Sequence, residues 1–162
     1  MISSWPLHID DSPRRTVSRI AAVARRLQRR EGLQTLIVDY LQLLTPEDSR
    51  APREQQVAAM SRQLKLLAKE LNIPVVALAQ LNRSIESRDD KEPRLSDLRE
   101  SGAIEQDADI VLFLDRPAEY RKDADSTLAT VKVAKNRSGK RSNINLRWHA
   151  ETMTFDSVPL DF

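Results

Sequence analysis

Cysteine is absent from the 162-residue chain, and aromatic residues make up only 4% of it. The lack of cysteine excludes a disulfide scaffold, a thiolate metal site and a cysteine nucleophile. Because hydrophobic residues still make up 40% of the chain, the core must be mainly aliphatic. No apolar run approaches the ~20 residues that a membrane-spanning helix needs. The first eleven residues also lack the basic and then apolar pattern of a signal peptide. We therefore expect a cytoplasmic protein with no membrane partner.

Glycine is scarce as well, with only Gly32, Gly102 and Gly139 in the whole chain. None of the three stands in the pattern G-x-x-x-x-G-K-[ST], which forms the phosphate-binding loop of P-loop ATPases. The N–H groups and the lysine of that loop hold the phosphates of the nucleotide. We therefore expect that the chain alone neither binds ATP tightly nor hydrolyses it.

The formal net charge is only +2, but the basic residues are unevenly placed. Residues 14–30 contain seven arginines and no acid, and residues 132–147 contain six basic residues and no acid. Either patch could bind phosphate. The alternative is a solvated helix face and a solvated hairpin, and charge alone favours this alternative.

A strand, a long helix and a second strand follow an amphipathic helix in the first half of the chain. The apolar spacing predicts helices over 16–31 and 53–71 and strands over 36–41 and 74–79. Successive apolar residues in both strand segments are typical of strands that are buried on both faces. A βαβ unit of this kind predicts that the two strands are parallel and adjacent.

The second half of the chain changes from helical to alternating patterns. Residues 82–95 are polar and predict a mobile loop, and a short element over 98–106 leads to a third apolar strand at 110–114. Alternation over 128–135 and 142–148, with a turn at Ser138 and Gly139, predicts an antiparallel hairpin. A further short strand is expected at 153–155. The pattern indicates one α/β domain over residues 1–162, with a single sheet that has an antiparallel edge.

Two polar residues stand at the carboxyl ends of the first two strands, where open α/β sheets bind ligands. Asp39 is the one acid in the run 36–44. A carboxylate in an apolar strand is costly to bury unless it meets a cation or hydrogen-bond donors, and Mg²⁺ is a natural partner. Gln80 could form hydrogen bonds both to a γ-phosphate and to a loop that moves, as a nucleotide sensor must. The alternatives are an aspartate that caps a loop and a glutamine that is a surface amide.

Lys135 and Arg137 stand one residue apart on the predicted hairpin, so their side chains project to the same face. Both could reach one phosphate, Arg137 with a fork of donors and Lys135 as a point charge. At a subunit boundary they could act in trans as an arginine finger, a device that elsewhere contributes ~10³–10⁵ in rate. The alternative is an exposed hairpin with charged tips.

Four sequence segments, taken together, resemble replicative DNA helicases of the DnaB type. They are LIVDYLQLL at 36–44, VVALAQLNRS at 75–84, SDLRESGAIEQDAD at 96–109 and KNRSG at 135–139. They are similar to that family's Walker B segment, sensor strand, DNA-facing loop with its following helix, and finger segment, in the family's order. The opening PLHIDD at 6–11 also fits, so the resemblance covers nearly the whole chain. It implies an α/β fold that is part of a RecA-like P-loop NTPase fold, with parallel strands, crossover helices and an antiparallel C-terminal hairpin.

The resemblance also implies roles for the four candidate residues that would act on ATP. Asp39 would be both the metal ligand for Mg²⁺ and a catalytic residue. Gln80 would sense the γ-phosphate. Lys135 and Arg137 would reach the nucleotide of the neighbouring subunit.

Three further residues would bind DNA if the resemblance holds. Arg99, Glu100 and Gly102 would line a central channel and hold the backbone of single-stranded DNA. A small loop that offers backbone N–H groups and one arginine can grip phosphates without reading bases.

The family places its phosphate-binding loop, the strand before it and the catalytic glutamate upstream of the segments that this chain contains. The chain is therefore expected to be the C-terminal portion of a motor that unwinds duplex DNA by translocating on single-stranded DNA, and to be inactive alone. The complete enzyme would use ATP and Mg²⁺. Its partners would be single-stranded DNA, the other subunits of a homo-hexamer, primase and a helicase loader.

Two other functions stay open at this point. One is a non-catalytic module that kept the fold and binds single-stranded DNA or helicase subunits. The other is a different RecA-like ATPase such as a recombinase, against which the segment at 99–106 argues. A metal-dependent nuclease fits poorly, because no cluster of acids and histidines stands at the strand ends.

Overall fold

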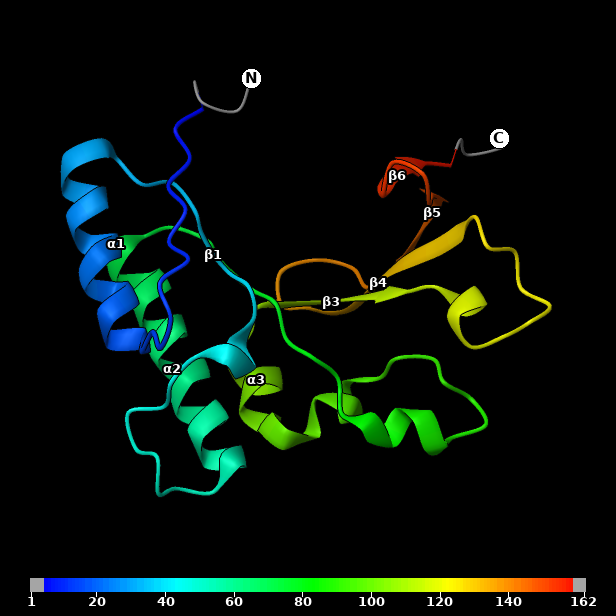
Figure 1. Ribbon diagram of the computed structural model, residues 1–162, viewed down its shortest axis with the longest axis horizontal. Coiled ribbons are helices and arrows are strands. Elements are labelled where there is room, and N and C mark those ends of the chain that lie inside the picture. Colours follow the sequence, from blue (N-terminus) through cyan, green and yellow to red (C-terminus); the bar gives the residue numbers. More distant parts are fainter. Residues whose placement is uncertain (1–4, 159–162) are drawn as a thin grey trace.

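The computed structural model of the chain describes residues 5–158, apart from the side chains of residues 83 and 99–101. A helical part with a small parallel sheet lies beside a four-stranded antiparallel sheet (Figure 1). The α-helices are α1 (Val17–Glu31), α2 (Arg53–Leu71) and α3 (Gly102–Asp107). The strands are β1 (Leu36–Val38), β2 (Val75–Ala77), β3 (Ile110–Asp115), β4 (Leu128–Asn136), β5 (Asn143–His149) and β6 (Thr154–Ser157). Short 3-10 helices are η1 (Leu41–Leu43), η2 (Arg83–Ser87), η3 (Leu95–Ser101) and η4 (Pro117–Glu119).

Both long helices begin and end close to the residues that the sequence indicates. The Thr16 hydroxyl accepts a hydrogen bond from the Arg19 N–H at 3.3 Å, which caps the first turn of α1. Gly32 ends α1 in the left-handed region at φ 71°, where glycine carries no Cβ penalty. Asn72 ends α2 in the same way at φ 52°. The predicted helices are confirmed.

The predicted βαβ unit is also confirmed. Strands β1 and β2 are parallel and paired from Leu36 with Val75 to Val38 with Ala77. Helix α2 connects them and lies next to α1 (Figure 1). The buried residues of this first core come from α1, β1, the start of η1 and α2: Val17, Val38, Leu41, Val57, Met60 and Leu64.

A second core forms under the antiparallel sheet. It contains Leu98, Val111 and Phe113. Ile104 of α3 packs against both cores, so this short helix joins the two parts of the molecule. The predicted element at 98–106 is therefore present as the end of η3 and most of α3.

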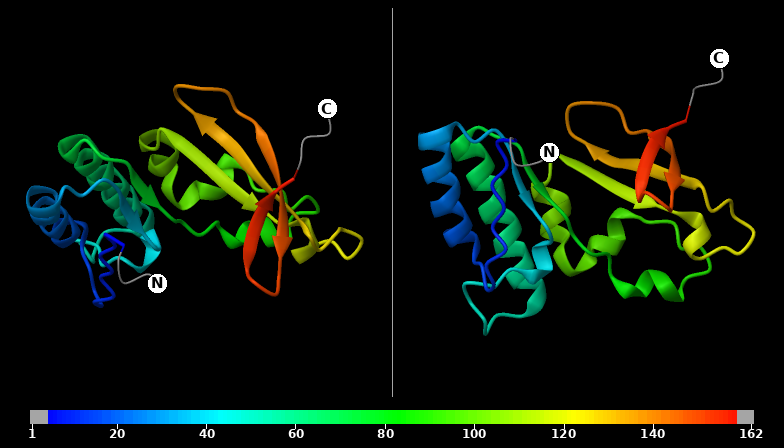
Figure 2. Two further views of the ribbon diagram at one scale, coloured as in Figure 1. Left: turned by 90° about the horizontal axis from the view of Figure 1, so that it is seen from above. Right: turned by 45° about the horizontal axis from the view of Figure 1, so that its top comes forward.

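The expectation that the apolar strands are buried on both faces is wrong. Val38 is buried, but its neighbour Ile37 is 64% exposed and Val76 of β2 is also exposed. The reason is that α1 and α2 both cover the same side of these strands (Figure 2). In β3 the apolar residues alternate, with Val111 and Phe113 inward and three others outward (Ile110, Leu112 and Leu114).

The expectation of a single sheet is wrong for the described residues as well. Strands β1 and β2 form one sheet, and β3, β4, β5 and β6 form another in that order. The third apolar strand pairs with β4 in antiparallel fashion, from Ile110 opposite Asn136 to Asp115 opposite Thr130. The hairpin β4–β5 and the short strand β6 are present as predicted. Within residues 5–158, no helix is both long and apolar enough to cross a membrane.

Candidate nucleotide and DNA site

The carboxyl ends of β1 and β2 bring two candidate residues to one edge of the parallel sheet. Asp39 directly follows β1, and Gln80 lies three residues after the end of β2. Hydrogen bonds extend the pairing beyond the strands, from the Leu78 N–H to the Val38 carbonyl at 2.9 Å and from the Leu41 N–H to the Leu78 carbonyl at 2.8 Å. Both candidate residues are exposed at this edge.

Gln42 holds the two strand exits together. Its side-chain amide donates to the Gln80 carbonyl at 3.1 Å and accepts from the Gln80 N–H at 3.1 Å. Arg53 at the start of α2 in turn donates to the Gln42 carbonyl at 2.7 Å. The backbone of Gln80 is therefore fixed, while its side chain is exposed to solvent.

Asp39 suits a Mg²⁺ ion that takes its other ligands from elsewhere. Its carboxylate is exposed and makes no hydrogen bond or ion pair with the residues that the structure describes. No group of three or more metal-binding side chains gathers anywhere in the described part of the chain. Mg²⁺ is often bound by one or two carboxylates together with waters and substrate phosphates. The donor set present here therefore fits a metal that arrives with a nucleotide.

Lys135 on β4 and Arg137 directly after it lie against the junction between α3 and β3. The Lys135 ammonium donates to the carbonyls of Glu105 and Gln106 at the end of α3. Arg137 Nη1 donates to Asp109 Oδ1 at 3.3 Å. The structure thus brings the two cations to the same short segment. Among the described contacts, none joins them to Asp39 or Gln80 of the same chain.

Asp109 stands between cations from two different elements. Lys65 of α2 pairs with one carboxylate oxygen, and Arg137 pairs with the other. The hydrogen bond from Lys65 is the main cause that lowers the pKa of Asp109 below its ordinary value, and the charges of Lys65, Arg137 and Lys135 act in the same direction. The carboxylate is therefore ionised at neutral pH.

The segment expected to face DNA is ordered around a buried carboxylate. Asp97 is 5% exposed and lies in η3. Its carboxylate accepts the Arg94 N–H at 2.8 Å and Arg88 Nη2 at 2.9 Å. Its carbonyl accepts the Asn82 N–H at 2.9 Å, which ties this segment to the exit of β2.

The three residues expected to bind DNA fall in this same region. The side chains of Arg99 and Glu100 lie outside the described residues, although their backbone belongs to η3. Gly102 begins α3 and is exposed. A Cβ built on Gly102 would meet nothing within 4 Å, so the fold itself leaves open space there.

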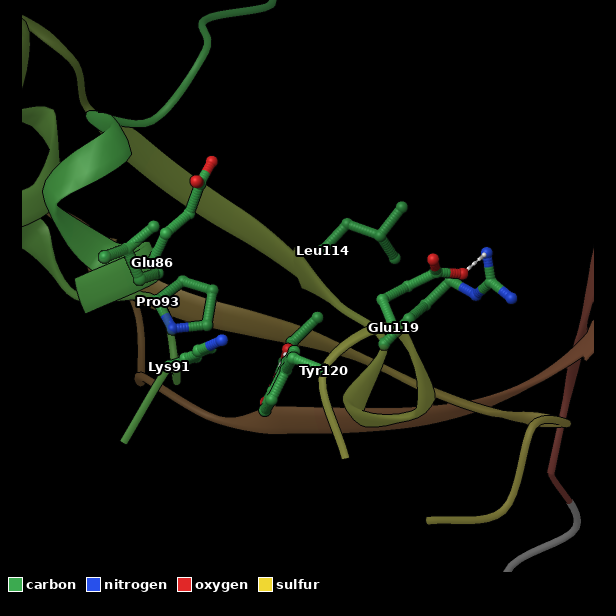
Figure 3. A pocket seen from close by; sticks show the side chains of 9 residues that line it. Glu86, Lys91, Pro93, Leu114, Glu119 and Tyr120 are labelled. Carbon is green, nitrogen blue, oxygen red and sulfur yellow. Dashed lines mark hydrogen bonds and ion pairs between the residues drawn. The ribbon is translucent and has the colours of Figure 1, made fainter. Parts of the chain in front are cut away.

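An open hollow of about 660 Å³ lies beside the end of β3 (Figure 3). Tyr120 and Glu119 face it, and the Tyr120 hydroxyl donates to Asp115 at 3.1 Å. Burial raises the pKa of Asp115, and burial together with that carboxylate raises the pKa of Tyr120 to about 12. These residues are not among those that the sequence indicates for ATP or DNA.

Comparison with known families assigns the chain. The model of the DnaB-like helicase C terminal domain matches residues 1–157. The chain belongs to this family. The fold is accordingly part of that of a RecA-like ATPase domain, as predicted, with the parallel and antiparallel sheets described above.

Curated relatives within the DnaB-like family are replicative helicases. The chain is 49% identical over 161 residues to the replicative DNA helicase DnaB of Leifsonia xyli subsp. xyli. This match covers 98% of the chain and 35% of that protein. It is 51% identical over 158 residues to DnaB of Mycobacterium leprae, covering 97% of this chain and 26% of that protein. DnaB of Geobacillus stearothermophilus is 46% identical over 163 residues, and the match covers 99% of this chain and 36% of that protein. The chain therefore spans about a third of the length of these relatives.

Two solved structures superpose closely on the chain. One is described as an ATPase domain, with a TM-score of 0.93, 40% identity and coverage of 98% of this chain and 57% of that one. The other is described as a DnaB-like replicative helicase and its interactions with primase, with a TM-score of 0.93 and 39% identity. It covers 98% of this chain and 39% of that one.

Sequence reasoning did not single out Gln42, Lys65, Asp97 or Asp109. A signal existed for Gln42, because it is the one amide in an otherwise apolar run after Asp39. Lys65 offered no such signal in the sequence, because its partner Asp109 is 44 residues away. Pairings of this kind come from the tertiary arrangement of α2 and α3, which a local pattern does not encode.

Proposed function

We propose that this chain is part of the ATP-driven motor of a replicative DNA helicase, which unwinds duplex DNA by translocating on single-stranded DNA. The observation that carries the proposal is the shared edge of β1 and β2, where Asp39 and Gln80 stand together with Gln42 fixing the second strand exit. Family membership supports the same function. Residues 1–162 would form one domain of that motor, working in the cytoplasm.

Asp39 would hold Mg²⁺, directly or through water, and Gln80 would sense the γ-phosphate. The metal would supply charge neutralisation on the phosphates. Lys135 and Arg137 would reach a nucleotide held by a neighbouring copy in a homo-hexamer. Their ammonium and guanidinium groups would stabilise the negative charge that develops during phosphoryl transfer.

Arg99, Glu100 and Gly102 would hold the backbone of single-stranded DNA at the start of α3. The open space at Gly102 supports the close approach of a phosphate backbone. Primase is proposed as a partner, because a structural neighbour is described with its interactions with primase. A helicase loader is proposed from the family resemblance alone.

The isolated 162-residue chain would not hydrolyse ATP, because its sequence contains no phosphate-binding loop. Steady-state ATP hydrolysis by the purified chain, with Mg²⁺ and single-stranded DNA present, tests this first. No turnover is expected. Turnover that Asp39→Ala abolishes would contradict the proposal, because phosphate would then be held here without such a loop.

A full-length helicase that carries these residues provides the positive test. Asp39→Asn should reduce its ATP turnover to background, while Asp123→Asn, at an exposed aspartate away from the site, should leave it unchanged. The alternative is a non-catalytic module that kept the fold and binds single-stranded DNA or helicase subunits. Binding of single-stranded DNA without any turnover in the full-length protein would support that alternative.

A further inference from the structure

The finger residue Arg137 is held at two points by Asp109. The Arg137 N–H donates to the Asp109 carbonyl at 2.9 Å, and Arg137 Nη1 donates to the Asp109 carboxylate at 3.3 Å. The side chain of Arg137 remains 59% exposed, and among the described contacts its Nη2 and Nε have no partner. Asp109 therefore contacts both the backbone and one side-chain nitrogen of Arg137, and it leaves the rest of the donor fork free to meet a phosphate.

The position of Asp109 is itself fixed from the helical layer. Lys65 pairs with its second carboxylate oxygen. Lys65 lies on α2, next to Leu64, which is buried in the first core. Because α2 is packed in the core, Lys65 limits the positions that Asp109 can take. Support of this kind keeps a catalytic group within a narrow range of positions.

The same segment connects the finger to the DNA-facing residues. Helix α3 begins at Gly102 and ends at Asp107, a length of about 9 Å at ~1.5 Å per residue. The Lys135 ammonium binds two carbonyls at the end of this helix, a favourable place for a cation. Gly102 and the carbonyls that bind Lys135 thus lie on one short helix, and Asp109, which binds Arg137, follows two residues after its end.

We propose that Asp109 is a positioning residue that orients Arg137 toward the nucleotide of a neighbouring subunit and, through α3, links that orientation to the DNA-facing segment. This inference rests on the proposed function, because it needs Arg137 to act on ATP in trans. Asp109 touches neither ATP nor DNA in this scheme. Its carboxylate affects ATP hydrolysis only through the position of Arg137.

Asp109→Asn in a full-length helicase that carries these residues tests the role. The asparagine keeps the size of the side chain but loses the charge that holds Arg137. A misplaced catalytic group can cost on the order of 10²-fold in rate. We expect a fall of about 10–100-fold in kcat for ATP and little change in KM, together with a smaller stimulation by single-stranded DNA. Glu70→Gln is the matched control, because it breaks another ion pair of α2, with Arg25, away from the finger.

Mixed rings separate positioning from general damage. An Asp39→Asn subunit has an inactive site but an intact finger, and an Asp109→Asn subunit has an intact site but a poorly held finger. Mixing the two should therefore restore activity above the sum of the separate preparations. Activity that stays additive would overturn the inference, since it would mean that Asp109→Asn damages its own nucleotide site.

The outcomes also separate this inference from the proposed function. If Asp39→Asn and Arg137→Ala both inactivate the enzyme and Asp109→Asn behaves like wild type, only the positioning role fails. If Arg137→Ala retains full activity, the finger role in the proposed function fails, and the role of Asp109 fails with it. A loss of about 10³-fold or more is expected for Arg137→Ala.

Discussion

Replacing Asp97 by alanine is expected to destabilise the segment before α3 by about 2–4 kcal/mol. The carboxylate is 5% exposed and accepts the Arg94 N–H at 2.8 Å and Arg88 Nη2 at 2.9 Å. Leaving the Arg94 N–H without an acceptor costs about 1–3 kcal/mol. The Arg88 side chain is 28% exposed and regains water in part, so its loss adds on the order of 1 kcal/mol.

Urea denaturation followed by far-UV circular dichroism measures the global part of this cost, and hydrogen exchange measures the local part. Exchange of the Asn82 amide is the sharper probe, because it donates to the Asp97 carbonyl at 2.9 Å. If η3 loosens, this amide should exchange faster by a factor that corresponds to the same free energy. A factor of ten in exchange corresponds to about 1.4 kcal/mol when exchange follows local opening.

Glu119→Ala is the control for a carboxylate that only pairs with an arginine at the surface. Glu119 pairs with Arg116, and its side chain is 63% exposed. Water and salt screen such pairs, so the control should change the free energy of unfolding very little. An Asp97→Ala protein that is as stable as Glu119→Ala, with unchanged exchange at Asn82, would refute the assignment of Asp97 as the organising carboxylate.

Two further predictions concern the core and the hollow beside β3. Leu64→Ala, at a side chain that is 4% exposed, should lower the free energy of unfolding by about 2–5 kcal/mol in a denaturant titration. Leu66→Ala, two residues away and 59% exposed, should change it by less than about 0.5 kcal/mol, and equal effects would contradict the assigned helix face. Tyr120 has its pKa raised from 10.0 to about 12, so its contribution to stability is present below pH 10 and is lost as the pH rises toward 12. Absorbance of phenolate at 295 nm should show a late step that Tyr120→Phe removes, and a Tyr120→Phe protein with the same late step would refute the assignment.

Local signals in the sequence account for the elements that could be predicted. Thr16 and Gly32 mark the two ends of α1. The Thr16 hydroxyl accepts a backbone N–H of the first turn, and the left-handed Gly32 donates its N–H to a carbonyl of the last turn, so both ends depend on neighbouring residues alone. The parallel pairing of β1 and β2 follows from a helical crossover between two apolar runs. The position of Asp39 and Gln80 at one edge follows from the same pairing.

The features that sequence reasoning missed depend on which elements meet across the fold. An apolar run such as Leu36 to Val38 has the same composition whether one face or both faces are covered. The pairing of β3 with β4 depends on the position of α3, which precedes β3 and whose Ile104 packs against both cores. The contact between Lys65 and Asp109 depends on the approach of α2 to α3. None of these has a periodic pattern.

The outward face of the strands has a consequence for the behaviour of the chain in solution. Ile37, Ile110 and Leu112 are each more than half exposed, and they lie on β1 and β3, whose outer edges are unpaired in the described part of the fold. Water tolerates scattered apolar side chains but disfavours grouped ones, and free strand edges offer hydrogen bonds to any extended peptide. Expressed by itself, this polypeptide would accordingly form oligomers as its concentration rises, and it would bind chaperones that recognise extended apolar segments.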